Sequence, residues 1–163
     1  AYTMQVPSMK EKTLRYPGHI ELMRVFRETG LFSHEPIDVG GVTVKPIDVI
    51  SRLMFPKWSY EPGEEDLTVM RIIVEGEKAG RRERHTWDLL AFYDRETQAT
   101  SMARTTAFPC AIMARALASG RYSNPGVNPP ERLGPDADLV EHVLAEHRAR
   151  GVEYRHRVEP IGP

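Results

Sequence analysis

Two apolar runs near the middle of the chain constrain its fold more than any other feature. They cover residues 67–75 and 86–93 and are rich in β-branched and aromatic residues, which is typical of β-strands. The interval between them, residues 76–84, is polar and contains two glycines. Because a polar connection of this length favours a hairpin over a parallel crossover, we expect a long hairpin of two antiparallel strands.

Four other segments show the periodicity of amphipathic helices. Their expected ranges are residues 19–28, 46–55, 106–119 and 138–150. Gly30, Gly120 and Gly151 follow three of them, and glycine accepts the left-handed geometry that ends a helix. Pro56 is expected to stop the second helix before it. Pro109 is acceptable in the third helix only if it falls in the first turn, where a missing N–H has no partner to lose.

Two further strands complete the predicted secondary structure. One covers residues 98–103, and the other covers residues 152–158, where polar and apolar residues alternate. Hairpins and helices in this order predict an α+β fold, with a mainly antiparallel sheet and helices packed on one face. A chain of 163 residues with 40% hydrophobic content suits one domain.

The charge balance restricts the partners. There are 22 basic and 23 acidic side chains and a formal net charge of -1, so neither sign has a surplus to attract nucleic acid or an anionic membrane. No apolar run approaches the roughly 20 residues that span a bilayer, and no secretory signal pattern is present. We therefore expect a cytoplasmic protein that binds neither nucleic acid nor membrane. The chain begins at Ala1 without an initiator methionine, which favours a cut through a longer chain.

The sequence gives little support for a metal site or a catalytic nucleophile. The single cysteine, Cys110, cannot form an internal disulfide or a thiolate cage, and its apolar neighbours predict a buried, inert thiol. His142 and His147 are five residues apart, so their side chains diverge on a helix, and we expect no metal site. The glycine pair at residues 40–41 predicts a turn rather than a phosphate loop. The basic run at residues 81–85 contains glutamate and predicts a solvated hairpin tip.

The segment that most favours a binding site is residues 11–19, EKTLRYPGH. An extended run delivers Thr13, Arg15 and Tyr16 to a Pro-Gly bend, and the first predicted helix begins directly afterwards. A helix N-terminus presents unpaired N–H groups and a partial positive charge, so Arg15 beside it would form a clamp for a carboxylate. The alternative explains these residues about equally well: Arg15 pairs with a surface carboxylate and Tyr16 packs.

A second group of donors, residues 104–109, stands at the start of the third predicted helix. Here the structural explanation is stronger, because Thr105 or Thr106 is already accounted for as the helix N-cap.

At these two segments the chain resembles the saccharopine dehydrogenase family, which includes saccharopine reductase and bacterial lysine 6-dehydrogenase. The agreement runs in order through nearly the whole chain. The matching segments are KTLRYPGH at 12–19, RETGLF at 27–32, DLTVMR at 66–71, MARTTAFP at 102–109, GV at 126–127, PE at 130–131 and RGVEY at 150–154.

The resemblance implies an oxidoreductase that depends on NAD or NADP and acts on the C–N bond of an amino acid. In such proteins a Rossmann domain binds the dinucleotide and a second α+β domain binds the substrate. Residues 1–163 look like the latter part of that second domain. The Rossmann fingerprint G-x-G-x-x-G is missing, which departs from the family's full pattern. The implied partners are the amino-acid substrate, the Rossmann domain of the parent chain and a second copy in a homodimer. The fragment alone is expected to be inactive.

By motif match, the resemblance places Thr13, Leu14 and Arg15 at the substrate, with Arg15 on a carboxylate. Tyr16 is expected to form a wall of the site, and His19 a weak contact. The family's acid–base residues lie upstream, so no catalytic, cofactor-binding or metal-binding residue is assigned here. Two substrates stay open: saccharopine, with three carboxylates, requires more than one arginine, and lysine requires one. The alternative function is a family member without chemistry that serves as a binding or dimerisation module.

Overall fold

The computed structural model describes residues 4–162, and these form two compact units. Residues 6–62 form one unit, and residues 63–162 together with residues 4–5 form the other. No helix among the described residues is both long and apolar enough to cross a membrane.

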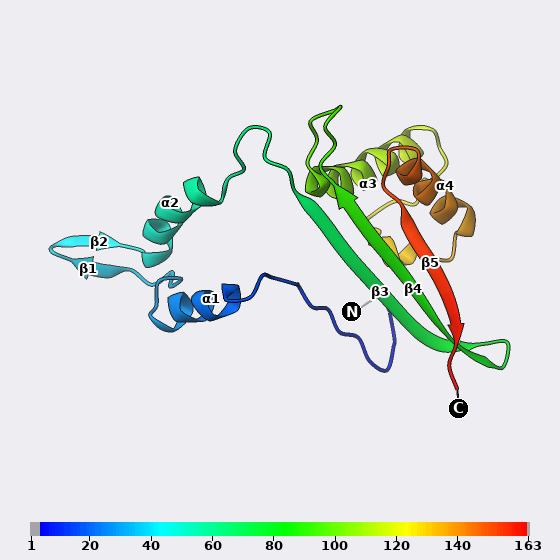
Figure 1. The fold of residues 1–163 in the computed structure, drawn as a ribbon, viewed down its shortest axis with the longest axis horizontal. Helices are drawn as coiled ribbons and strands as arrows, with labels where there is room; N and C mark the ends of the chain where they lie inside the picture. The colour runs from blue at the N-terminus through cyan, green and yellow to red at the C-terminus, as the bar shows by residue number, and fades with distance from the viewer. Residues whose placement is uncertain (1–3, 163) are drawn as a thin grey trace. The chain divides into compact units, whose positions relative to one another are not determined.

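The unit of residues 6–62 contains two helices and a short hairpin (Figure 1). Helix α1 covers His19–Glu28, as predicted, and Gly30 follows it with a φ of 83°. After this turn Phe32 packs edge-to-face against Phe26, with ring centroids 6.0 Å apart. Strands β1 (Ile37–Val39) and β2 (Val42–Val44) pair antiparallel, and helix α2 covers Pro46–Trp58.

Two features of this unit differ from or refine the prediction. Helix α2 continues past Pro56, so the expected stop before that residue is wrong. A proline this close to the C-terminal end removes one intrahelical bond and no more, and the main-chain N–H of Ser59 still donates to the carbonyl of Phe55 at 3.0 Å. The predicted turn at residues 40–41 is confirmed: both glycines have positive φ angles, and they connect β1 to β2, a hairpin that the prediction omits.

The second unit is built on a three-stranded antiparallel sheet in the order β3-β4-β5 (Figure 1). Strand β3 covers Leu67–Lys78, β4 covers Arg81–Phe92 and β5 covers Tyr154–Pro160. The predicted hairpin is confirmed, but both strands extend through the polar interval and meet at a turn of Ala79 and Gly80, with φ angles of 51° and 74°. Polar residues continue the strands because they pair across the ladder, as Arg84 does with Glu75 at 2.6 Å.

Three further elements follow the hairpin. Helix α3 covers Ser101–Ala118, a 3-10 turn covers Pro130–Arg132, and helix α4 covers Ala137–Arg148. Helix α3 packs against β3 and β4, and α4 packs against α3. Both predicted helices are confirmed with shifted ends, and the predicted α+β fold is confirmed, with every strand pair antiparallel.

The start of α3 overturns three expectations. Residues 98–103 form no strand, because the helix already begins at Ser101 and only an isolated bridge joins Asp94 to Ala99. The N-cap is Thr100, whose side chain accepts from the N–H of Ala103, so neither Thr105 nor Thr106 is the cap. Pro109 consequently lies inside the helix and not in its first turn.

Asp66 explains why α3 begins early. Its carboxylate accepts hydrogen bonds from the main-chain N–H groups of Ser101 and Met102, at 2.5 and 2.9 Å, and from the Ser101 hydroxyl at 2.9 Å. Partial burial disfavours the charged carboxylate, but these hydrogen bonds outweigh that effect and lower the pKa of Asp66. A residue directly before β3 therefore fixes the N-terminus of α3 to the sheet, an attachment that local sequence patterns do not reveal.

The core of this unit is small and lies between the sheet and α3. Leu89, Ala91 and Val152 are buried in it, and Met70, Phe108 and Tyr154 pack around them. Cys110 is exposed, so the predicted buried thiol is wrong. It lies two residues from the buried Ile112, about 200° around the helix, and this rotation turns it away from the core.

Arg104 is a charged residue inside this packing. It is 8% exposed and donates to the carbonyls of Phe92 at 3.0 Å and Arg150 at 2.7 Å. It therefore joins α3 to the end of β4 and to the segment that follows α4. Gly151 makes room for it: a Cβ at this position would lie 2.7 Å from Nη2 of Arg104, and the φ of 73° is also one that only glycine adopts freely.

We predict that Gly151→Ala destabilises the protein more than Gly120→Ala. Gly120 has the same φ of 73° but no atom within 4 Å of a Cβ, so its variant reports backbone strain alone. We expect about 1 kcal/mol for Gly120→Ala and about 1–3 kcal/mol more for Gly151→Ala, because Arg104 has to give up a buried hydrogen bond. Urea unfolding of both variants measures the difference, and equal losses would show that Arg104 moves without penalty.

Candidate functional site

The predicted binding segment lies in the unit of residues 6–62. Residues 13–16 have no regular secondary structure, a turn follows at Pro17 and Gly18, and α1 begins at His19. The N–H of His19 donates to the carbonyl of Tyr16 at 3.2 Å, and Gly18 has a φ of 89°. The bend that the sequence predicts before the helix is therefore present, and glycine suits it because its φ is positive.

The N-terminus of α1 carries no side-chain cap. Gly18 is the N-cap residue and has no side chain to accept from the first-turn N–H groups, although its carbonyl accepts from the N–H of Leu22 at 3.2 Å. Uncapped N–H groups and the helix dipole leave partial positive charge at this end. Glu21 lies in the first turn and is the one acidic side chain there, so it competes with any anion for that charge.

Arg15 and its neighbours are turned to solvent. Leu14 is 76% and Tyr16 is 84% exposed, and Thr13 and Arg15 are exposed as well. His19 is half-buried. Nη1 of Arg15 donates to the carbonyl of Leu14 at 3.0 Å, and among residues 4–162 no carboxylate forms an ion pair with it. The alternative, in which Arg15 pairs with a surface carboxylate and Tyr16 packs, is thus not the arrangement in the described structure.

The same unit contains a shallow cavity of about 610 Å³, and the predicted binding residues do not line it. It lies between strand β2 and helix α2, and its charged residues are Lys45, Asp48 and Arg52. The sequence prediction missed this hollow because it omitted the β1–β2 hairpin. The alternation of Val42, Thr43 and Val44 after the two glycines is the signal that could have found it.

The other charged groups singled out in the sequence have structural roles. Arg104 is buried and joins α3 to the segment that follows α4. The hydroxyl of Thr105 donates to the carbonyl of Ser101, as a threonine inside a helix often does. In the run of residues 81–85, Arg81 and Arg82 are exposed at the hairpin turn, as predicted, whereas His85 is half-buried and 3.1 Å from His156. Within the described residues no three His, Cys, Asp or Glu side chains gather in a way that could hold a metal ion.

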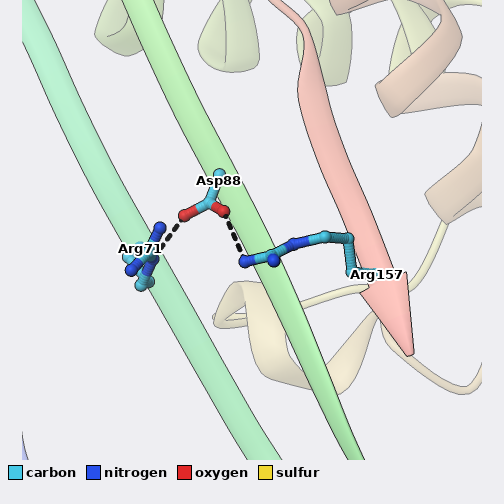
Figure 2. A network of polar contacts seen from close by, with 3 residues as sticks. All are labelled: Arg71, Asp88 and Arg157. Carbon is cyan, nitrogen blue, oxygen red and sulfur yellow. Dashed lines mark hydrogen bonds and ion pairs between the residues drawn. The ribbon is translucent and has the colours of Figure 1, made fainter. Parts of the chain in front are cut away.

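One network of charges lies on the face of the sheet opposite the core. Asp88 of β4 accepts from Nε of Arg71 at 2.5 Å and from Nη2 of Arg157 at 3.2 Å, which joins all three strands (Figure 2). The hydrogen bond from Arg71 is the main cause that lowers the pKa of Asp88, and the charge of Arg157 adds to it. The two arginines are exposed and Asp88 is half-buried, so solvent weakens these ion pairs. The network connects the strands and is not a buried reactive site.

His147 is the one fully buried imidazole among the described residues. It is 3% exposed, and neither ring nitrogen has a hydrogen-bond partner, while its ring stacks on Tyr154 with centroids 5.7 Å apart. Burial lowers the pKa of His147, and the nearby charge of Arg150 lowers it further. The lowered pKa favours the neutral form of the ring where it stacks on Tyr154.

Comparison with known proteins now adds to this geometry. A family model described as the saccharopine dehydrogenase C-terminal domain matches residues 1–152. The chain belongs to this family. The resemblance drawn from residues 12–19 and the six later segments is therefore confirmed, and members of the saccharopine dehydrogenase family are generally NAD(P)-dependent oxidoreductases.

Three relatives of this saccharopine dehydrogenase C-terminal domain bear two names. Carboxynorspermidine synthase of Vibrio cholerae is 33% identical over 131 residues, which cover 77% of this chain and 30% of that protein. The enzyme of the same name from Vibrio alginolyticus is 31% identical over 128 residues, covering 74% and 30%. The mitochondrial alpha-aminoadipic semialdehyde synthase of Bos taurus is 31% identical over 110 residues, covering 66% and 11%. The chain thus spans less than a third of the length of each relative.

We predict that His147 makes the stability of the protein fall as the pH drops below about 6.5. Because its folded-state pKa lies below the unfolded value of about 6.5, the unfolded state binds the proton more readily, and the contribution of the neutral ring is lost as the pH falls below that value. The variant His147→Leu removes this titration. Urea unfolding between pH 8 and about pH 5 should show a smaller decline for the variant. Parallel declines would contradict a lowered pKa.

Proposed function

We propose that this chain is part of the second, substrate-binding domain of an NAD(P)-dependent oxidoreductase that acts on the C–N bond of an amino-acid substrate, saccharopine or a lysine-like compound. Family membership supports this proposal. Hydride would pass between the nicotinamide and the carbon bonded to nitrogen. The dinucleotide would be bound mainly by a Rossmann domain elsewhere in the parent polypeptide, in the cytoplasm. Residues 1–163 alone would then lack activity.

The observation that carries the assignment of the site is the state of Arg15. Its guanidinium has no carboxylate partner among the described residues, and four residues later in the sequence α1 begins without a side-chain cap. A guanidinium without an ion-pair partner and uncapped helix N–H groups are each suited to a carboxylate ligand. We assign Arg15 to the substrate carboxylate and the Thr13 hydroxyl to a supporting hydrogen bond. Leu14, Tyr16 and His19 would form contacts around it.

The names of the relatives bear on the substrate class. Two are named for a carboxylated polyamine and one for a semialdehyde of an amino acid. These compounds, like saccharopine and lysine, carry a carboxylate together with an amine or a carbonyl group from which a C–N bond can form. One arginine clamp accounts for one such carboxylate. A substrate with several would require further basic residues, and Lys45 and Arg52, which line the cavity beside α2, are two candidates in the same unit.

The alternative proposal is a family member that has lost its chemistry and serves as a binding or dimerisation module. The feature that favours it is the outer edge of β3, which has no pairing strand among residues 4–162. The two proposals differ in a simple measurement: a module shows no change in nicotinamide absorbance with lysine, saccharopine or a carboxylated polyamine, whichever dinucleotide is supplied.

We predict that Arg15→Ala in the full-length enzyme weakens substrate use. If the guanidinium binds the carboxylate in a bidentate way, the loss in kcat/KM corresponds to about 2–4 kcal/mol, roughly 30- to 900-fold. Arg15→Lys keeps the charge but loses the planar fork, so it should fall between the two. Steady-state kinetics followed by nicotinamide absorbance measure both.

Arg24→Ala is the matched control for this experiment. Arg24 is also exposed, lies on α1 and pairs only loosely with Glu28 at 3.9 Å, so its loss should leave kcat/KM unchanged. Unchanged kinetics in Arg15→Ala would reject the carboxylate clamp. Equal losses in the Arg15 and Arg24 variants would point to general charge on this unit instead.

A further inference from the structure

Three aromatic rings gather on the core-facing side of the sheet, beyond the end of the core. Side chains alternate along a strand, so His85 and Trp87 of β4 share the face of the buried Leu89, and His156 of β5 lies opposite Trp87 in the register. The rings of Trp87 and His156 are stacked, with centroids 4.4 Å apart and an interplanar angle of 3°. Nδ1 of His85 lies 3.1 Å from Nε2 of His156, within hydrogen-bond distance. These contacts join β5 to β4 through side chains.

The hydrogen bond between the two imidazoles depends on their protons. One ring nitrogen has to carry a proton, and the other has to accept it with a free electron pair. Glu83 sets the direction, because an ionised carboxylate only accepts, and its Oε2 lies 3.4 Å from Nε2 of His85. That nitrogen therefore carries a proton, and Nδ1 of a neutral His85 accepts from Nε2–H of His156. The chain of donors runs from His156 through His85 to Glu83.

A first added proton leaves this arrangement intact, and a second one breaks it. The first enters at Nδ1 of His156, the ring nitrogen that the chain of donors does not use. The resulting cation stays stacked on Trp87 and donates to a neutral His85, which cation–π attraction and charge-assisted hydrogen bonding both favour. A second proton, on Nδ1 of His85, removes the acceptor between the two rings. Two N–H groups and two positive charges then face each other.

We propose that the hydrogen bond between His85 and His156 is a pH-sensitive fastening, which holds β5 on β4 while at least one of the two imidazoles is neutral and is lost when both are protonated. Histidine changes its charge between about pH 5 and 8, so β5 is held at neutral pH and loosened in acid. Loosening β5 also weakens the ion pair of Arg157 with Asp88 on the opposite face. The proposal does not depend on the proposed substrate or cofactor.

The charged groups around the pair do not change the sign of this effect. In the described structure, the charged residues that line the hollow beside His85 are Glu77, Lys78 and Glu83. These charges alter how readily protons are taken up, but none of them supplies an acceptor between the two rings once both imidazoles are protonated.

The strands on either side of His85 add no titratable group to this face. Its partners in the register are Val74 of β3 and Val158 of β5. Arg155 and Arg157 of β5 belong to the opposite face, because side chains alternate. The nearest titratable groups along the same face of β5 are Tyr154 and the ring that stacks on it, His147 of α4. His147 is also sensitive to acid, so the experiment has to separate it from the pair.

Hydrogen exchange of the full-length protein, followed by mass spectrometry, tests this fastening because it reports on each strand separately. Between about pH 7.5 and pH 5, and after correction for intrinsic exchange rates, protection of β5 should fall about 2- to 12-fold more than protection of β3, which is the effect of one lost hydrogen bond. His85→Gln and His156→Gln should each remove this difference, since glutamine offers an acceptor oxygen at any pH. The double variant should change nothing further, because the two residues act as one unit.

Two control variants separate the pair from other histidines. His34→Gln changes an exposed histidine of the other unit and should keep the difference between β5 and β3. His147→Leu removes the buried imidazole and should keep it as well. Equal losses of protection in β5 and β3 of the native protein would overturn the proposal, and this measurement does not depend on any variant folding. Persistence of the difference in the His85 and His156 variants, or its disappearance in His147→Leu, would overturn it by assigning the acid sensitivity to another group.

Discussion

The twelve-residue pairing of β3 with β4 determines most of what the second unit presents to its surroundings. Once the register is set, the odd-numbered residues of β4 face α3 and supply Leu89 and Ala91 to the core. The even-numbered residues face away and carry Asp88 with its two arginines. A shift of one residue would exchange these faces and bury charge, which is why the apolar pattern holds the register firmly.

Much of this could be predicted from the sequence, because periodicity reports it directly. The range of α1, the antiparallel hairpin and the glycine turn at residues 40–41 follow from local patterns. The start of α3 could not be predicted in this way. Residues 98–103 are compatible with a strand, and what decides for a helix is the carboxylate of Asp66, which lies far away in the sequence. The exposure of Cys110 could have been predicted, because it lies about 200° around the helix from Ile112, whichever residue begins the helix.

Less of the candidate site than of the fold could be predicted from the sequence. Sequence reasoning located the bend at residues 16–19 and the helix start, and the structure contains both. Sequence reasoning could not tell whether other residues enclose this segment. In the structure residues 13–16 are exposed, and the cavity of the same unit is lined by other residues. Such exposure is compatible with the proposal that this chain is part of a larger substrate-binding domain. The family membership and the short share of each relative that the chain covers agree with that view.

The contact between Arg104 and Gly151 also has a consequence for how this protein can evolve. The two positions are epistatic, because any side chain at 151 collides with the guanidinium as long as the arginine is there. A lineage that exchanged Arg104 for a shorter residue would remove the steric clash with a side chain at position 151. The positive φ at that position would remain, and after glycine asparagine adopts it most readily. Natural variation at 151 should therefore appear only in the genetic background of a changed residue 104.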